Sequence, residues 1–224
     1  MRSCKLYEFR RRRKVDQPAH VDTPEEFPPL PVLPETLLCM ELSVGVPAVG
    51  LDDLASVVLR DVGATLQIMR AAGKESVFCE PGPHRIEDRI SELGVQRCLE
   101  ALKYEASIRG GLRPEIRQAW NHAREIAENC RSLAEEHGIG FPARDAYLVG
   151  LFHELDTLPS LLGWTDKAAC ADGQTLVHVW SLPECVRMHF LEQQAVTSWT
   201  PWSELVRSAH ARLVLQQDAA SAHS

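Results

Sequence analysis

The chain has 224 residues, of which 45% are hydrophobic and 25% are charged, as in an ordinary globular protein. No apolar run approaches the roughly 20 residues that a membrane-spanning helix needs, and the net charge of −7 disfavours binding to nucleic acid or anionic membranes on average. The seven cysteines include no Cys-x-x-Cys pair, so neither a disulfide framework nor a zinc knuckle is indicated. We therefore expect a cytoplasmic protein.

Residues 1–27 form a polar segment that leads into a proline-rich stretch, and we predict a basic arm and a linker here. The arm holds five adjacent cations, Arg10, Arg11, Arg12, Arg13 and Lys14. Such a run can contact the phosphates of nucleic acid or of acidic lipids. It is more often a solvated arm, and the aromatic residues of a single-strand binding surface are not interleaved with it. It is a candidate anion contact, and nucleic acid is not the expected partner.

Residues 28–215 have the apolar spacing of helices, and we divide them at the Gly110-Gly111 pair. In the N-terminal part, 28–109, the segment HRIEDRISELGVQRCLEAL predicts two short helices that Gly94 separates. In the second part, 112–215, Pro114 suits the first turn of a helix of about six turns that ends near Gly138.

The next predicted helix, within YLVGLFHELDTLPSLLGW, is apolar and contains the adjacent pair His153 and Glu154. A further helix opens at Pro183, and in the last one Thr200 suits the N-cap and Pro201 the first turn. Residues 216–224 are predicted to be a tail. Alternating strand patterns and Asn-Gly hairpin signals are absent from the sequence, so we predict an all-α helical bundle.

Three segments resemble the HDOD family, the HD-related output domain of bacterial signalling proteins. The first is LPVLP at residues 30–34 with the following LASVVLRDVGATLQIMRAA, and the second is the HRIEDRISELGVQRCLEAL pair. The third is an HD-like half made of NHAREIAE, YLVGLFHELDTL and VWSLPECV. The resemblance runs from about residue 30 to 215. It implies an all-helical bundle that acts beside two-component or cyclic di-GMP machinery, generally without demonstrated catalysis.

The chain departs from the related HD signature at the positions that hold metal. Where HD proteins have His-Asp-x-Gly-Lys, the chain reads HELDT from His153, so the aspartate becomes Glu154 and both the glycine and the lysine are lost. Where catalytic HD enzymes supply a final aspartate, the last helix reads SAHA around His210. With His122 in NHAREIAE, the resemblance implies four metal positions of HD type: His122, His153, Glu154 and His210.

These four residues have two interpretations. Imidazole suits zinc, nickel and iron, and a carboxylate can complete the shell, so a divergent metal-dependent phosphatase or phosphodiesterase is the alternative. Against it, the added methylene of Glu154 moves the carboxylate by about 1 Å, which can cost about a hundredfold in rate. Partly buried histidines bonded to neighbours would also explain His122 and His153. The sequence favours a vestigial site with no catalytic residue and no cofactor.

We therefore predict a non-catalytic regulatory or scaffolding module that contacts signalling proteins. Trp180 and Trp202 are assigned to the core. Trp199 lies just outside the last predicted helix, and it is the candidate contact for a partner or for self-association. A third hypothesis, which the sequence favours less, is an adaptor that is tethered to nucleic acid or membrane through the basic arm.

Overall fold

The computed structural model describes residues 27–28, 30–44, 49–75, 85–103, 112–137, 140–165, 171–194 and 201–222. Every regular element in these ranges is a helix, so the predicted all-α class is confirmed. Within the described ranges, no helix has the length and apolar character needed to cross a membrane. The basic run Arg10 to Lys14 and the candidate contact Trp199 lie outside the described residues.

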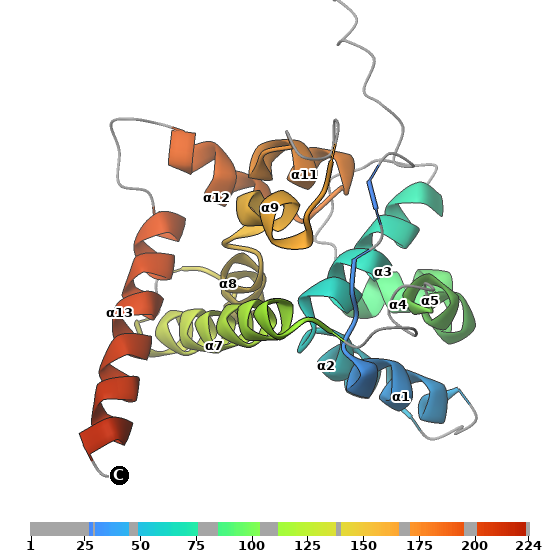
Figure 1. The fold of residues 1–224 in the computed structure, drawn as a ribbon, viewed down its shortest axis with the longest axis horizontal. Coiled ribbons are helices and arrows are strands. Elements are labelled where there is room, and N and C mark those ends of the chain that lie inside the picture. The colour runs from blue at the N-terminus through green and yellow to red at the C-terminus, as the bar shows by residue number, and fades with distance from the viewer. Residues whose placement is uncertain are drawn as a thin grey trace, which may run out of the picture.

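The helices form two groups (Figure 1). The N-terminal group consists of α1 (Pro34–Ser43), α2 (Leu51–Val58), α3 (Val62–Glu75), α4 (Ile86–Leu93) and α5 (Val95–Leu102). The second group consists of α7 (Pro114–His137), α8 (Ala143–Leu151), the 3-10 turn η2 (Leu155–Thr157), α9 (Leu158–Leu162), α11 (Gly173–Val179), α12 (Glu184–Gln194) and α13 (Pro201–Ala222). In Figure 1, α7 lies between the N-terminal group and α13, and α8 lies against it.

The predicted helix boundaries at glycine and proline are observed. Gly94 has a φ of 75°, which favours glycine, and its N–H donates to the carbonyl of Ile90 at 2.8 Å, so that α4 ends there and α5 starts at the next residue. Pro114 is the first residue of α7, where its missing N–H costs no helical hydrogen bond. Trp180 and Trp202 are both buried, as predicted for core residues.

The long helix α7 packs closely on α8 because Gly150 faces it. A Cβ atom at Gly150 would lie 2.7 Å from the Cα of Ala127, which is closer than real Cβ contacts allow. On α7, the buried residues recur three and four positions apart, as one face of a helix requires. They include Ile116, Trp120, Ala123, Ile126, Ala127, Cys130 and Leu133. This close contact sets the position of α8 against α7, and therefore the position of the turn that follows α8.

The prediction that His153 and Glu154 lie within a helix is wrong. The helix α8 ends at Leu151, Phe152 has φ −111° and ψ 13°, and the chain turns through residues 152–154 before η2 and α9. Beyond Leu151 the helical hydrogen bonds are replaced, because the Gly150 carbonyl bonds Nδ1 of His153 and the N–H of Leu155 donates to Phe152, three residues earlier. Pro159 also prevents one helix from continuing through residues 155–159, because its ring would clash with the carbonyl of Leu155. Here Pro159 lies in the first turn of α9 instead. Residues 216–222, assigned to the tail, continue α13.

A buried carboxylate, Asp61, ties the opening segment to α3. Its oxygens accept the N–H of Leu33 at 2.7 Å and that of Ala64 at 3.1 Å, and the Thr36 side chain adds a further hydrogen bond. Burial raises the pKa of Asp61 to about 6, although these hydrogen bonds oppose the shift. The segment also approaches Gly63 closely, since a Cβ there would lie 1.9 Å from the carbonyl oxygen of Pro31.

We expect Asp61→Ala to lower the free energy of unfolding by about 2–4 kcal/mol, because it leaves buried donors without their acceptor. The matched control is Asp52→Ala, which removes an exposed carboxylate from the first turn of α2 and should cost under about 1 kcal/mol. Urea denaturation of the two variants measures the difference. Equal costs would show that Asp61 does not hold the opening segment in place.

Candidate metal centre

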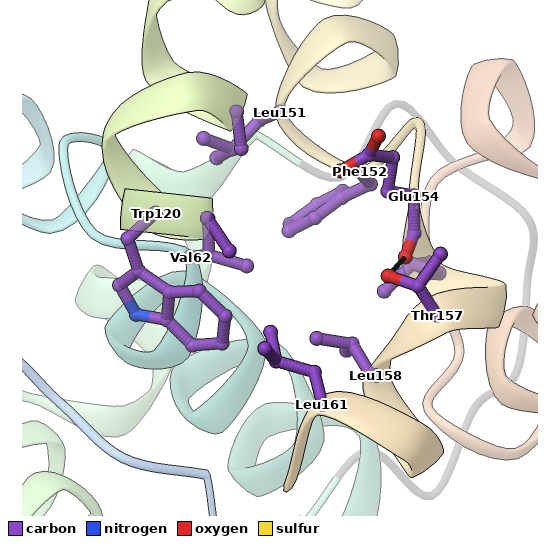
Figure 2. A pocket seen from close by; sticks show the side chains of 11 residues that line it. Val62, Trp120, Leu151, Phe152, Glu154, Thr157, Leu158 and Leu161 are labelled. Atoms are coloured by element: carbon purple, nitrogen blue, oxygen red, sulfur yellow. Dashed lines mark hydrogen bonds between the residues drawn. The ribbon is translucent and has the colours of Figure 1, made fainter. Parts of the chain in front are cut away.

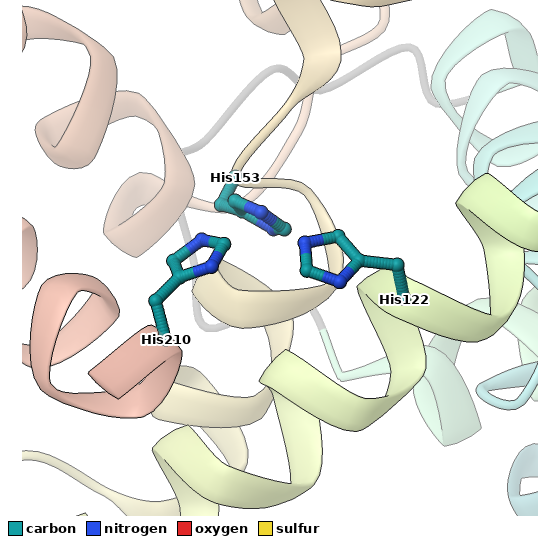
Figure 3. Close-up of side chains that lie close together, drawn as sticks. All are labelled: His122, His153 and His210. Atoms are coloured by element: carbon teal, nitrogen blue, oxygen red, sulfur yellow. The ribbon is translucent and has the colours of Figure 1, made fainter. Parts of the chain in front are cut away.

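Three histidines from separate elements converge at one place (Figure 3). His122 comes from α7, His153 from the turn after α8, and His210 from α13. One ring nitrogen of each lies within 4.8 Å of the others. The ring centroids are 5.5 Å apart for His122 and His153, 5.1 Å for His122 and His210, and 4.9 Å for His153 and His210. The structure thus brings together the three histidines that the sequence analysis selected.

His153 is oriented from behind by the backbone. Its Nδ1 lies 2.7 Å from the carbonyl oxygen of Gly150. A carbonyl can only accept, so Nδ1 carries the proton and donates. Nε2 is buried without a hydrogen-bond partner, and Figure 3 shows the ring facing the other two imidazoles. Metal-ligating histidines have this arrangement, with one nitrogen bonded to a backbone carbonyl and the other free to bind the ion.

Glu154 extends beside two of these rings. Its Oε1 lies 3.6 Å from Nε2 of His153 and 4.0 Å from Nε2 of His122. The neighbouring imidazole of His153, with smaller contributions from the charges of His122 and His210, holds the pKa of Glu154 below its usual range. The longer side chain that replaces aspartate therefore still places a carboxylate oxygen near the imidazoles. Only about half of this side chain is exposed.

Burial lowers the pKa of His210, and the neighbouring His153 and His122 lower it further. Both effects favour the neutral imidazole, which is the form that binds a metal. His122 and His210 are partly exposed, whereas His153 is 6% exposed. The group is therefore reachable from solvent on one side and enclosed on the other.

His189 is a residue that the sequence analysis missed. It lies on α12, is 1% exposed, and its pKa is lowered to about 4 by burial and then by the charge of His153. The sequence feature that indicates burial of His189 is its spacing, three residues after Val186 and four after Cys185, both of which are also buried. That spacing puts His189 on the buried face of α12, so the charge of His153 acts on a further histidine from a fourth element.

The donor set of His122, His153, His210 and Glu154 is chemically suited to one divalent transition metal. Zinc binds imidazole nitrogen at about 2.0–2.1 Å, so two nitrogens in a tetrahedral shell lie about 3.3 Å apart. Ligand atoms within 4.8 Å of one another reach that spacing through side-chain movements of about 1 Å. The residues therefore fit the kind of ion that HD proteins hold.

A small pocket adjoins Glu154 on the side of the N-terminal helices (Figure 2). Its volume is about 20 Å³, which is room for about one water molecule. The walls are mainly apolar and include Val62, Trp120, Ala123, Leu151, Phe152, Leu158 and Leu161. The polar lining residues are Glu154 and Thr157, and the Thr157 hydroxyl donates to the main-chain oxygen of Glu154 at 2.8 Å.

The HDOD domain family matches residues 30–172 of the chain. The chain therefore belongs to the HDOD family. The matched region includes His122, His153 and Glu154, whereas His210 lies beyond it.

Two solved structures of the MmoQ response regulator from Methylococcus capsulatus strain Bath have a similar fold. One is 18% identical with a TM-score of 0.57 and covers 81% of each chain. The other is 16% identical with a TM-score of 0.58 and covers 81% of this chain and 83% of that one. Curated protein sequences contain no significant match.

The buried His189 generates a prediction on pH. Its folded-state pKa of about 4 lies below the ordinary 6.5, so the unfolded chain binds a proton that the folded chain does not. This contribution to stability is complete above about pH 6.5 and is lost as the pH falls towards 4. We expect His189→Gln to reduce the loss of stability between pH 7 and 5 by about 1–2 kcal/mol. Chemical denaturation at both pH values measures it.

The control is His178→Gln, since His178 is an exposed histidine on the neighbouring helix α11. It should keep the pH dependence of the wild-type chain. The same dependence in all three proteins would mean that His189 becomes protonated as readily in the folded chain as in the unfolded chain.

Proposed function

We propose that this HDOD protein is a cytoplasmic, non-catalytic regulatory module of bacterial signal transduction that contacts other signalling proteins. Its membership of the HDOD family supports a signalling role, as do the solved relatives that are named response regulators. Two-component or cyclic di-GMP machinery is the expected setting. The proposed partners are proteins of that machinery.

Two features beside Glu154 support the non-catalytic part of the proposal, namely the size of the adjoining pocket, which none of the three histidines lines, and the loss of a lysine. Ligand pockets usually have volumes of about 300–1,000 Å³, and this one has about 20 Å³. A phosphoester cannot enter it without movement of its apolar walls. The lysine of the HD signature, a cation that would attract phosphate, is replaced by Thr157. Both features count against phosphoryl chemistry at this place.

The convergence of three imidazoles favours a second candidate, a divergent metal-dependent phosphohydrolase. In that enzyme, His122, His153, His210 and Glu154 would hold the ion. A bound divalent metal lowers the pKa of water and polarises a phosphoryl oxygen. This chain would contribute the orientation of His153 by Gly150 and a carboxylate, Glu154, beside the ligands.

A phosphatase and phosphodiesterase screen with p-nitrophenyl phosphate and its bis ester, at added Zn²⁺, Mn²⁺ or Mg²⁺, separates the two candidates. We expect no turnover above that of the double variant His153→Ala with Glu154→Ala. The double change should cost about 1–3 kcal/mol in stability, because it removes a buried side chain and its hydrogen bond. Turnover that the wild type has and a folded double variant lacks would establish the enzyme.

Exposed leucines on α1 support a contact surface for proteins. Leu38 and Leu42 are 56% and 65% exposed, and their spacing of four residues puts them on the same side of the helix. Val44 and Leu51, which follow α1 along the chain, are also exposed. Leucines exposed together on one side of a helix, as Leu38 and Leu42 are, are typical of interaction surfaces. Trp199 remains a separate prediction outside the described residues.

We expect Leu42→Asp to reduce the recovery of signalling proteins that are cross-linked to the chain in its own cells, because a charge would enter an apolar contact. The matched control is Val214→Asp, since Val214 is equally an exposed apolar residue but lies on α13. Quantitative mass spectrometry compares the two variants with the wild type. Unchanged recovery with Leu42→Asp would exclude the α1 surface as the contact.

A further inference from the structure

The buried nitrogen of His153 indicates that the histidine group binds a ligand. Nε2 has no hydrogen-bond partner, since Oε1 of Glu154 at 3.6 Å lies beyond hydrogen-bond distance, and its side chain is only 4% exposed. Such an atom is costly to bury. Nδ1 is already used by the carbonyl of Gly150, so the ring cannot turn to satisfy Nε2 without losing that hydrogen bond. A cation that accepts the Nε2 lone pair would remove the cost. The rings of His122 and His210 lie where they would share that cation.

The chemistry of the donors indicates which cation fits. Magnesium and calcium prefer shells of six or more oxygens, and here three donors are imidazole nitrogens and one is a carboxylate oxygen. Three imidazoles with one carboxylate suit zinc, and also nickel or copper. Partial exposure of His122 and His210 gives the ion a path from solvent.

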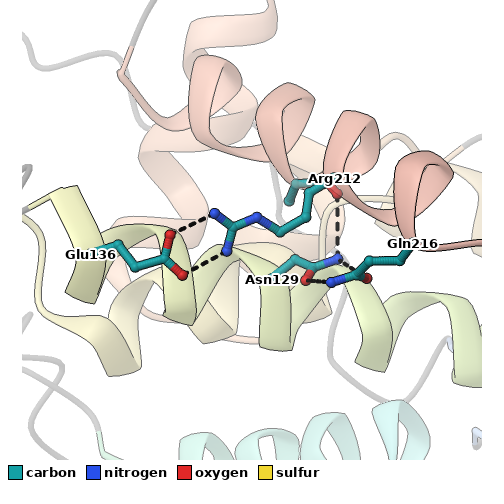
Figure 4. Close-up of polar contacts among 5 residues, drawn as sticks. Asn129, Glu136, Arg212 and Gln216 are labelled. Carbon is teal, nitrogen blue, oxygen red and sulfur yellow. Dashed lines mark hydrogen bonds and ion pairs between the residues drawn. The ribbon is translucent and has the colours of Figure 1, made fainter. Parts of the chain in front are cut away.

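Two groups of polar contacts join α7 to the helix that carries His210 (Figure 4). Arg212 donates to both oxygens of Glu136, at 2.8 and 2.6 Å, in an exposed pair that water and salt screen. Asn129 meets Gln216 and the carbonyl of Ala209 at 3.5 Å, at the long end of hydrogen bonding. The same helix also buries an apolar stripe, which includes Leu205, Val206, Ala209 and Leu213.

We propose that His122, His153, His210 and Glu154 bind one zinc ion reversibly, and that the ion fastens α13 to α7 and to the turn after α8. Each histidine comes from a different element, so a single ion cross-links all three. Metal occupancy then controls how firmly α13 is docked, and it is the input signal of the module. This last step rests on the proposed regulatory function. The inference departs from the vestigial site that the sequence favours.

Calorimetric titration with zinc tests the binding, using apo protein that is prepared with a chelator and then dialysed. We expect one ion per chain and, with cobalt as the probe, the visible absorption of a tetrahedral complex. Because loss of a residue that only orients a ligand typically costs 10–100-fold in affinity, His210→Gln and His122→Gln should each weaken zinc binding by at least about 100-fold. His178→Gln, which changes an exposed histidine elsewhere, should bind as the wild type does.

Hydrogen exchange of the α13 amides tests the fastening. If zinc binds only when α13 is docked, a free zinc concentration of about 100 times the Kd suppresses the opening of this helix by up to about 100-fold. We expect that slowing in the wild type and in His178→Gln, and none in His210→Gln or His122→Gln. His122 is partly exposed on α7, so its variant remains informative if His210→Gln fails to fold.

Three results would overturn the inference: no stoichiometric zinc, zinc affinity that survives both histidine variants, or bound zinc that leaves α13 exchange unchanged. Failure of the proposed function has a different signature. A zinc-loaded chain that hydrolyses phosphoesters would refute the non-catalytic role while the fastening of α13 still held.

Discussion

The close contact between α7 and α8 at Gly150 is the constraint on which the site depends. Because a side chain at Gly150 would collide with Ala127, only glycine lets the two helices approach this closely. The same residue supplies the carbonyl that bonds Nδ1 of His153. One residue thus sets both the distance between the helices and the direction in which His153 presents its other nitrogen.

The end of α8 is equally important for the chemistry. Adjacent residues on a continuous helix point about 100° apart, so His153 and Glu154 could not both face one centre from such a helix. The turn at residues 152–154 allows Oε1 of Glu154 to lie 3.6 Å from Nε2 of His153. The lengthened carboxylate, which on the sequence alone counts against a site, is therefore compatible with one.

The site also joins the matched HDOD region to a helix outside it. His122 and His153 lie in that region, and His210 on α13 completes the group. Three imidazoles at this distance repel one another when they are protonated, and this repulsion adds to burial in lowering the pKa of His210. Glu154 offsets part of the repulsion. The lowered pKa of His210 favours its neutral imidazole, which is the form that binds a metal ion.

The sequence by itself determined the helical class and the breaks at Gly94 and Pro114, because helical periodicity and the restrictions of glycine and proline are local. It pointed to His122, His153, Glu154 and His210 only through the resemblance to HD proteins. The tertiary structure alone decided that α8 ends before His153, that Nε2 of this residue is buried, and that the charge of His153 reaches His189 on α12. Ring orientation and burial depend on contacts between residues far apart in the chain. A local pattern along the sequence does not predict those contacts.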